Sequence, residues 1–167
     1  VAGVEVLQES LFLQKLDASF NEEWLYDYPL NYGLYSENLS LLELDNSDIE
    51  IIASVYDYDN DLVKGIIKKF NSSGSLLNTY NLDNSSDHYL YSAIKSDDNN
   101  LIITGALEAT GPYNERMLLY KCTPEGEILW QRFYNMMSYN GGISVNHTED
   151  NGYIISGYTS EEEFEEN

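Results

Sequence analysis

The chain has few positive charges. Its 167 residues include 8 Lys and Arg against 29 Asp and Glu, which gives a formal net charge of −21 and a pI near 4.1. A surface of this sign repels phosphate backbones and anionic lipid headgroups, so we expect no nucleic-acid partner. We expect instead a protein or glycan partner that is basic or that binds through bridging cations.

Long apolar runs and a recognisable secretion signal are also missing. No stretch approaches the roughly 20 apolar residues that span a bilayer, and no basic segment followed by an apolar one opens the sequence. We therefore expect no membrane insertion. Because the first residue is Val1, we expect the chain to be a segment of a longer chain or assembly. The single cysteine, Cys122, excludes an internal disulfide, and its strand-like surroundings predict a small buried side chain.

Recognisable catalytic and cofactor motifs are missing as well. The sequence has no G-x-S-x-G segment, no glycine-rich phosphate loop and no zinc-binding spacing of Cys and His. His88 lies in a polar connection and His147 follows a predicted strand, so both are interpreted as surface residues. Acidic residues are so abundant that paired carboxylates carry no information about glycoside hydrolysis. We expect neither enzymatic activity nor a cofactor.

What the sequence does contain is a repeat of about fifty residues, a period typical of repeat architectures. Three similar segments are "SDIEIIASVY" (47–56), "DNNLIITGAL" (98–107) and "DNGYIISGYT" (150–159). The small residues that close the apolar triplets are Gly3, Ser54, Gly105 and Gly157, spaced 51, 51 and 52 residues apart. A second series with spacings of 54 and 52 residues is Lys15, Lys69 and Lys121.

Each repeat consists of short runs rich in Ile, Val, Tyr and Phe, with no sustained helical period. We predict antiparallel strands near residues 11–17, 24–28, 39–44, 49–56, 65–70, 77–82, 90–95, 101–107, 116–122, 128–134, 142–148 and 152–159. The segments "NSSGS" (71–75) and "TPEGE" (123–127) predict tight turns with a glycine in fourth position. The corresponding "DASFN" (17–21) places Phe20 there, which predicts a distorted turn.

Four short antiparallel strands per repeat are the content of a β-propeller blade. The pattern "ILWQRFY…GG…DNGYIISGYT", preceded by "MLLYKCTPEGE", resembles the degenerate repeats of bacterial secreted and surface β-propellers. The resemblance covers residues 1–159 and implies an extracellular or cell-surface location and shared packing positions, with no implied catalytic residues. The tryptophans at equivalent positions, Trp24 and Trp130, are interpreted as core residues.

The predicted fold class is therefore all-β, with about three four-stranded antiparallel blades that form part of a larger propeller. The repeat units are a partial unit at about 1–17, complete units at 18–70 and 71–122, and a partial unit at 123–159. The remaining residues, 160–167, are interpreted as an acidic loop or tail.

One acidic loop has the spacing of a calcium-binding segment. Asp57, Asp59 and Asp61 alternate in "DYDND" (57–61), as oxygen ligands do in short Ca²⁺ loops. The loop lacks a glycine in sixth position and a downstream glutamate, so we favour a solvated turn and keep a Ca²⁺ site as the alternative. The equivalent loops do not repeat the spacing.

Two classes of function remain open at this stage. The first is a non-catalytic propeller scaffold of a secreted or cell-surface bacterial protein that mediates protein–protein or glycan interactions. The alternative is part of a propeller-fold enzyme, a polysaccharide lyase or hydrolase, whose active site lies outside this segment. We favour the first, because rigid blades present loops for binding and no catalytic cluster is recognisable.

Overall fold

The computed structural model describes residues 10–29, 33–34, 39–82, 87–108 and 114–161. The described residues form antiparallel β-strands and contain no α-helix, which confirms the all-β prediction. The strands are β1 (Ser10–Leu16), β2 (Glu22–Pro29), β3 (Gly33–Leu34), β4 (Ser40–Glu43), β5 (Ile49–Asp57), β6 (Leu62–Phe70), β7 (Leu76–Asn81), β8 (His88–Lys95), β9 (Leu101–Glu108), β10 (Glu115–Cys122), β11 (Ile128–Tyr134), β12 (Tyr139–His147) and β13 (Tyr153–Ser160).

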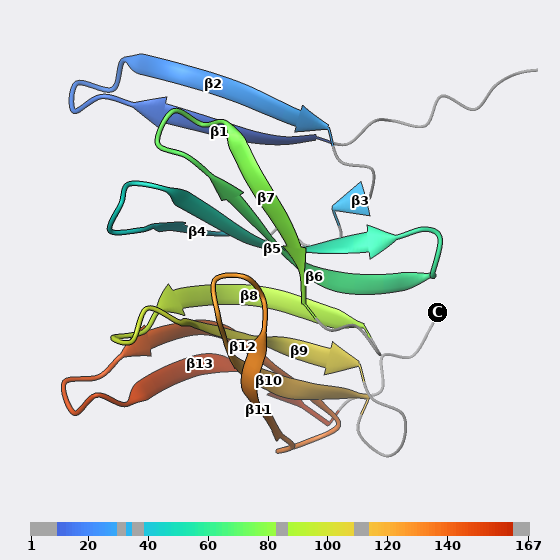
Figure 1. Cartoon of the computed structure of the whole chain (residues 1–167). Helices are drawn as coiled ribbons and strands as arrows, with labels where there is room; N and C mark the ends of the chain where they lie inside the picture. The colour runs from blue at the N-terminus through green and yellow to red at the C-terminus, as the bar shows by residue number, and fades with distance from the viewer. Residues whose placement is uncertain (1–9, 30–32, 35–38, 83–86, 109–113, 162–167) are drawn as a thin grey trace, which may run out of the picture.

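The strands form four sheets that are stacked face to face in the order of the sequence (Figure 1). Sheet A contains β1 and β2, and sheet B contains β3 to β7, with both β3 and β4 paired to β5. Sheet C has the order β11-β10-β9-β8, and sheet D contains β12 and β13. Apart from β3 and β4, consecutive strands within each sheet are paired with one another, and tight turns set the pairing of β1–β2, β4–β5, β8–β9 and β12–β13.

Apolar side chains fill each space between neighbouring sheets. Leu11 and Leu13 of sheet A pack with Ile51 and Phe70 of sheet B. The largest cluster joins sheets B and C and contains Ile52, Ile67, Leu82, Leu90, Ala93, Leu101, Ile103, Leu107, Leu118, Tyr120 and Cys122. A third cluster, with Val145 at its sheet D side, joins sheets C and D. The central strands β5 and β9 are buried on both faces, which is why their sequences read as unbroken apolar runs.

The predicted strands all correspond to observed ones, with ends that differ by up to three residues. The short strand β3 had no sequence signal, because its two residues, Gly33 and Leu34, are too few to show an alternating pattern. The first anchor, Gly3, lies outside the described residues, as do residues 162–167 of the predicted acidic tail.

The repeat register differs from the sequence prediction by one residue in sheet B. Lys69 on β6 pairs with Glu50 on β5, whereas Lys121 on β10 pairs with Ile102 on β9. Because the two lysines are equivalent, Glu50 and Ile102 occupy the same position in consecutive sheets. Glu50 therefore stands where the next repeat has an apolar residue.

The same pairing moves the small-residue anchor. Ala53, rather than Ser54, is the counterpart of Gly105 and Gly157, and the anchors are then 52 residues apart in both steps. At both glycines a methyl group would overlap a backbone carbonyl oxygen of the adjacent strand, that of Tyr89 or of Gly141 respectively. The small residue at this position therefore permits a close approach of the two backbones.

The turn at 17–21 is not distorted, contrary to the prediction. Phe20 adopts φ 63°, close to the 81° of Gly74 and the 85° of Gly126 in the equivalent turns. Its amide donates to the carbonyl of Asp17 at 3.0 Å, as the amide of Gly126 donates to Thr123 at 2.9 Å. The turn keeps its shape, and Phe20 takes a left-handed backbone conformation that favours glycine.

Candidate functional site

The two ends of the stacked sheets differ in character. The turns β1–β2, β4–β5, β8–β9 and β12–β13 lie together at the left of Figure 1, and we call this the turn end. The β5–β6 turn, the start of β8, the adjoining ends of β9 and β10, and the end of β13 lie at the opposite side, which we call the loop end. The candidate site is the loop end, because buried and exposed polar side chains meet there.

A buried ion pair forms the base of the loop end. The Lys64 Nζ atom donates to Asp57 Oδ2 at 2.8 Å, and both side chains are about nine-tenths buried. Asp57 also accepts from the Asn60 side chain at 3.0 Å and from the Asp59 amide at 3.1 Å. The hydrogen bond from Lys64 is the main cause that lowers the pKa of Asp57 to about 2. Asp57 is thus an anionic, fully bonded residue that fixes the β5–β6 turn.

The other two residues of the predicted calcium loop point elsewhere. Asp59 is exposed, and Asp61 accepts a hydrogen bond from the Tyr56 hydroxyl. The three carboxylates do not converge, and within the described ranges no three His, Cys, Asp or Glu side chains gather as metal ligands do. Ca²⁺ binding by Asp57, Asp59 and Asp61 stays a prediction for titration to test.

A second carboxyl group, that of Asp87, links the start of β8 to sheet B. Asp87 Oδ1 accepts the Val63 amide of β6 at 2.6 Å, and the Asp87 carbonyl accepts the Glu108 amide at 3.0 Å. A hydrogen bond with Asp87, followed by burial, raises the pKa of the Glu108 carboxyl. The structure therefore brings together two carboxyl groups that lie far apart in the sequence.

Tyrosine and acidic side chains continue this surface toward sheet D. The Tyr158 hydroxyl of β13 donates to Glu115 Oε2 of β10 at 2.6 Å. Burial and this hydrogen bond raise the pKa of Tyr158. Asn114 donates to the Tyr139 hydroxyl at 2.6 Å, and Tyr58 beside the β5–β6 turn is 66% exposed. The loop end presents aromatic rings with polar edges beside carboxylates.

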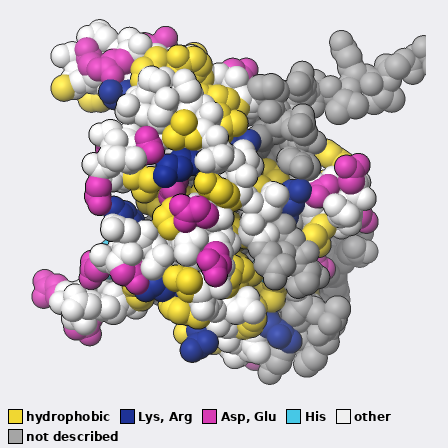
Figure 2. Space-filling view, viewed as in Figure 1, with side chains coloured by type: hydrophobic (Ala, Val, Ile, Leu, Met, Phe, Trp, Pro, Cys, Tyr) yellow, Lys and Arg dark blue, Asp and Glu magenta, His cyan; other side chains and the backbone are white. Residues whose placement is uncertain are grey.

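The charge on this surface is negative. Asp59, Asp61 and Glu108 are exposed, whereas the Lys64 ammonium is already paired with Asp57. Acidic side chains lie at both ends of the face in Figure 2, and basic side chains are spread over it. The loop end can therefore accept hydrogen bonds from cationic or hydroxyl-rich groups.

His88 is not a surface residue, which corrects the sequence interpretation. It begins β8 and is buried between sheets B and C, where its Nε2 atom lies 2.8 Å from the Tyr120 hydroxyl. Beside it, the Ser54 hydroxyl donates to the His88 carbonyl at 3.1 Å and accepts the Leu90 amide at 2.7 Å. The polar neighbours of His88 in the sequence concealed the inward direction of its own side chain. His147 is exposed, as predicted.

A buried acidic residue lies nearer the turn end. The Glu50 side chain is fully buried, and neither carboxyl oxygen has a hydrogen-bond partner. Burial raises the pKa of Glu50 to about 7, and the positive charges of Lys69 and Lys95 oppose this rise while Glu125 and Asp48 add to it. The carboxyl group is therefore held in the neutral form across much of the range below neutral pH.

Three residues interpreted as core residues from the sequence are placed in the packed layers. Trp24 packs with the cluster between sheets A and B, and Trp130 with the cluster between sheets C and D. Cys122 is a buried free cysteine whose pKa is raised to about 12 by burial. None of the three belongs to the loop end.

Comparison with known proteins adds no family. No family model and no curated protein matches the chain. Throughout the described part of the chain, no helix is long and apolar enough to cross a membrane.

Proposed function

We propose that the chain is a segment of a β-propeller in which sheets B and C are blades. The proposal is supported by the 52-residue spacing of Ala53, Gly105 and Gly157 and by the face-to-face packing of successive sheets. Sheet C has the four strands of one blade in sequential order, and sheet B has the same order in β4 to β7.

We further propose that this propeller segment is a non-catalytic scaffold of a secreted or cell-surface bacterial protein. It mediates a protein–protein or glycan interaction through the loop end. The observation that carries the proposal is the exposed acidic and tyrosine-rich surface there, beside a cation that is already paired. A tyrosine ring gives apolar contact area and a polar edge at low cost in side-chain entropy, which suits both glycan and protein surfaces.

The partner surface is expected to be basic or bridged by cations. A net charge of −21 attracts such a surface over distance, and the exposed Asp59, Asp61 and Glu108 give it local contacts. Rim charges of this kind act mainly on association rate and salt dependence.

A different enzymatic function, with its active site inside this segment, has one observation in its favour. The Asp87 and Glu108 carboxyl groups are hydrogen-bonded, and this contact raises the pKa of Glu108, as a general acid requires. Asp87 also accepts the Val63 amide of β6 through its carboxylate and the Glu108 amide of β9 through its carbonyl, so the pair is equally explained as a structural link between sheets B and C.

Affinity capture from the bacterial envelope and culture medium, together with a glycan array, tests the proposed function. The loop-end variant Asp59→Asn with Glu108→Gln is compared with the control variant Asp97→Asn with Glu127→Gln, which removes the same charge from the β8–β9 and β10–β11 turns. We expect binding that the loop-end variant loses and the control variant keeps. Turnover of a polysaccharide that Glu108→Gln abolishes, with no partner captured, would support the enzyme instead.

A further inference from the structure

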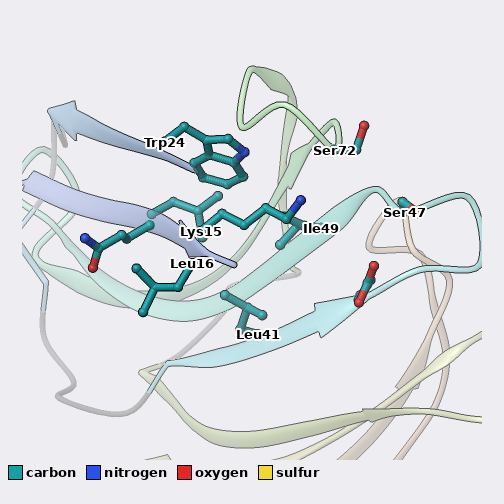
Figure 3. Close-up of a pocket in the computed structure, with 10 residues that line it drawn as sticks. Lys15, Leu16, Trp24, Leu41, Ser47, Ile49 and Ser72 are labelled. Atoms are coloured by element: carbon teal, nitrogen blue, oxygen red, sulfur yellow. The ribbon is translucent and has the colours of Figure 1, made fainter. Parts of the chain in front are cut away.

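A buried glutamate interrupts the apolar face of sheet B that packs on sheet C. Ile49 and Ile51 of β5 point toward sheet A, where Ile49 lines a cavity together with Trp24 (Figure 3). Because side chains alternate along a strand, Glu50 and Ile52 point the other way, into the space between sheets B and C. Ile52 belongs to the apolar cluster there, and Glu50 is the next side chain toward the turn end.

The fold does not require a carboxyl group at this position. Its counterpart in sheet C, Ile102, is fully buried and apolar. A buried acid elsewhere in the structure, Asp57, has the ammonium group of Lys64 and the side chain of Asn60 as partners. Within the described part of the chain, neither oxygen of the fully buried Glu50 has such a partner. Buried ionisable groups of this kind cost stability, which makes them candidates for a functional role.

The positive charges near Glu50 are already paired. Lys69 of β6 lies directly opposite Glu50, and its Nζ atom is 3.7 Å from Asp48 Oδ2. From sheet C, Lys95 at the end of β8 places its Nζ atom 2.7 Å from Asp45 Oδ2. Each of these two ammonium groups has a carboxylate of its own. An ionised Glu50 would therefore be an additional negative charge between them.

Strand β10 and the turn after it complete the surroundings of the carboxyl group. Burial is the main cause of the raised pKa of Glu50, Glu125 in this turn adds to the rise, and Lys95 opposes it. Burial, followed by the charge of Glu50, also raises the pKa of the Cys122 thiol at the end of β10. The thiol and the carboxyl group are therefore neighbours across the space between sheets B and C.

The carboxyl group lies close to the ends of the strands around it. Glu50 is the second residue of β5, and Lys69 is the last but one of β6. Lys95 and Cys122 are the last residues of β8 and β10. The β6–β7 and β10–β11 pairs also contain a register shift at this end. Strand ends open at a lower free-energy cost than strand centres, so the turn end can separate while the apolar cluster stays packed.

We propose that Glu50 is a proton-controlled latch between the turn ends of sheets B and C. When protonated, the carboxyl group is neutral and packs with the apolar side chains of the two sheets. When ionised, it is a buried charge whose neighbouring ammonium groups are held by other carboxylates, and the turn end opens to hydrate it. The latch lies at the opposite end of the sheets from the proposed binding surface and goes beyond that function.

The direction of the pH effect follows from two pKa values. The pKa of Glu50 is about 7 in the closed structure and near the ordinary 4.5 once water reaches the group. Between these values the group is neutral when closed and ionised when open, so the opening equilibrium becomes more favourable as the pH rises. Above this range both forms are ionised and the effect levels off. Between pH 5.5 and 8 the opening constant should increase about 25-fold.

The single cysteine reports this opening in the 167-residue chain. Cys122 is fully buried beside Glu50, so N-ethylmaleimide reaches its thiol when the turn end opens. Because ionisation of the thiol also speeds the reaction, each rate is divided by the rate of Glu50→Gln at the same pH, a variant that cannot ionise at this position. This ratio should rise about 25-fold between pH 5.5 and 8. Glu50→Ile serves as a second reference and should give the same rise.

Urea distinguishes a local opening from unfolding of the whole protein. Low urea concentrations strongly accelerate labelling that requires global unfolding, because a large surface is exposed, and barely change labelling through an opened strand end. At pH 8 the labelling rate of Cys122 should depend little on low urea. The control is Val145→Cys with Cys122→Ser, which places the thiol in the packed space between sheets C and D. Its labelling should be slower and should depend steeply on urea.

Two results would overturn the latch. A labelling ratio that stays constant from pH 5.5 to 8 against both references would show that ionisation of Glu50 does not open the turn end. A urea dependence of Cys122 equal to that of Val145→Cys would show that the thiol is reached only by unfolding of the whole protein. Neither measurement involves a binding partner, so the loop-end proposal stands or falls on its own experiment.

Discussion

Glu50 on β5 is the cross-strand partner of Lys69 on β6. The equivalent pair in the next sheet is Ile102 on β9 with Lys121 on β10. The carboxyl group is fully buried, its oxygens have no hydrogen-bond partner, and its pKa is raised to about 7. An isolated carboxyl group between two packed sheets costs stability whenever it is ionised.

Replacement of this residue by the repeat's apolar residue should stabilise the protein in a pH-dependent way. The pKa of Glu50 is about 7 in the folded state and near 4.5 in the unfolded chain. Between these two pH values the carboxyl group is protonated when the protein is folded and ionised when it is unfolded, so its contribution to the free energy of unfolding falls as the pH rises. Between about pH 5.5 and 8 the advantage of Glu50→Ile over the wild type should grow by about 2 kcal/mol. Urea unfolding at both pH values measures this, with the exposed Glu127→Gln as control. If Glu50→Ile stabilises the protein equally at both pH values, the raised pKa of Glu50 is contradicted.

The turn at residue 20 predicts a second stabilising change. Phe20 has φ 63° and is mostly exposed, so Phe20→Gly removes backbone strain without loss of packing. The left-handed conformation costs a residue with a side chain roughly 1–2 kcal/mol, and glycine avoids this cost. Glycine also gives the unfolded chain more conformational entropy, which offsets roughly 0.5–1 kcal/mol of that stabilisation. We expect a net gain of about 0.5–1 kcal/mol in the free energy of unfolding. Gly126→Ala in the equivalent turn should lower stability, and a loss in both variants would show that Phe20 is not strained.

The close approach at Gly105 predicts a destabilising change. A methyl group there would overlap the backbone carbonyl oxygen of Tyr89. This oxygen belongs to the backbone of β8, so relief of the overlap requires a shift of the strand. Gly105→Ala should cost at least about 1–3 kcal/mol, as other overpacked core positions do. Gly152→Ala is the control, because its methyl group would meet the rotatable Thr148 hydroxyl. Thermal unfolding measures the stability of both variants. An equal loss of stability in Gly105→Ala and Gly152→Ala would contradict the close contact between Gly105 and the Tyr89 carbonyl.

The calcium hypothesis has a direct titration test. Calorimetry with Ca²⁺ would show binding that Asp59→Ala removes if the loop closes on the ion. Asp57 is already held by Lys64 and Asn60, so the structure favours no heat above the buffer control at millimolar Ca²⁺. Binding of Ca²⁺ would require Asp57 to exchange its ammonium partner for the metal.

The sequence was sufficient for what depends on local pattern and period. Short runs of Ile, Val, Tyr and Phe predicted the strands, and the repeat of about fifty residues marked Gly105 and Gly157 as equivalent positions. The anchor in sheet B was misplaced because Ala53 and Ser54 are both small, and strand pairing alone distinguishes them. A signal for the correct register was present in the 52-residue spacing of Ser40, Ser92 and Ser144.

The candidate site was harder to predict because its contacts join distant parts of the chain. Asp87 and Glu108 meet through the alignment of β8 with β9, and Tyr158 of sheet D contacts Glu115 of sheet C. Many carboxylates share the same local surroundings in the sequence, so none of these pairs stood out. The burial of His88 depends likewise on the packing of sheet B against sheet C.

The central claim is that the acidic loop end binds a basic partner surface. Its most direct test is the affinity for a peptide rich in lysine and arginine, measured for the wild type and for the two charge-matched double variants at about 0.1 and 0.5 M NaCl. We predict that affinity falls with salt and that Asp59→Asn with Glu108→Gln weakens it several-fold, while Asp97→Asn with Glu127→Gln leaves it near the wild-type value. Equal weakening by the two variants would show attraction by net charge alone and would contradict a binding site at the loop end.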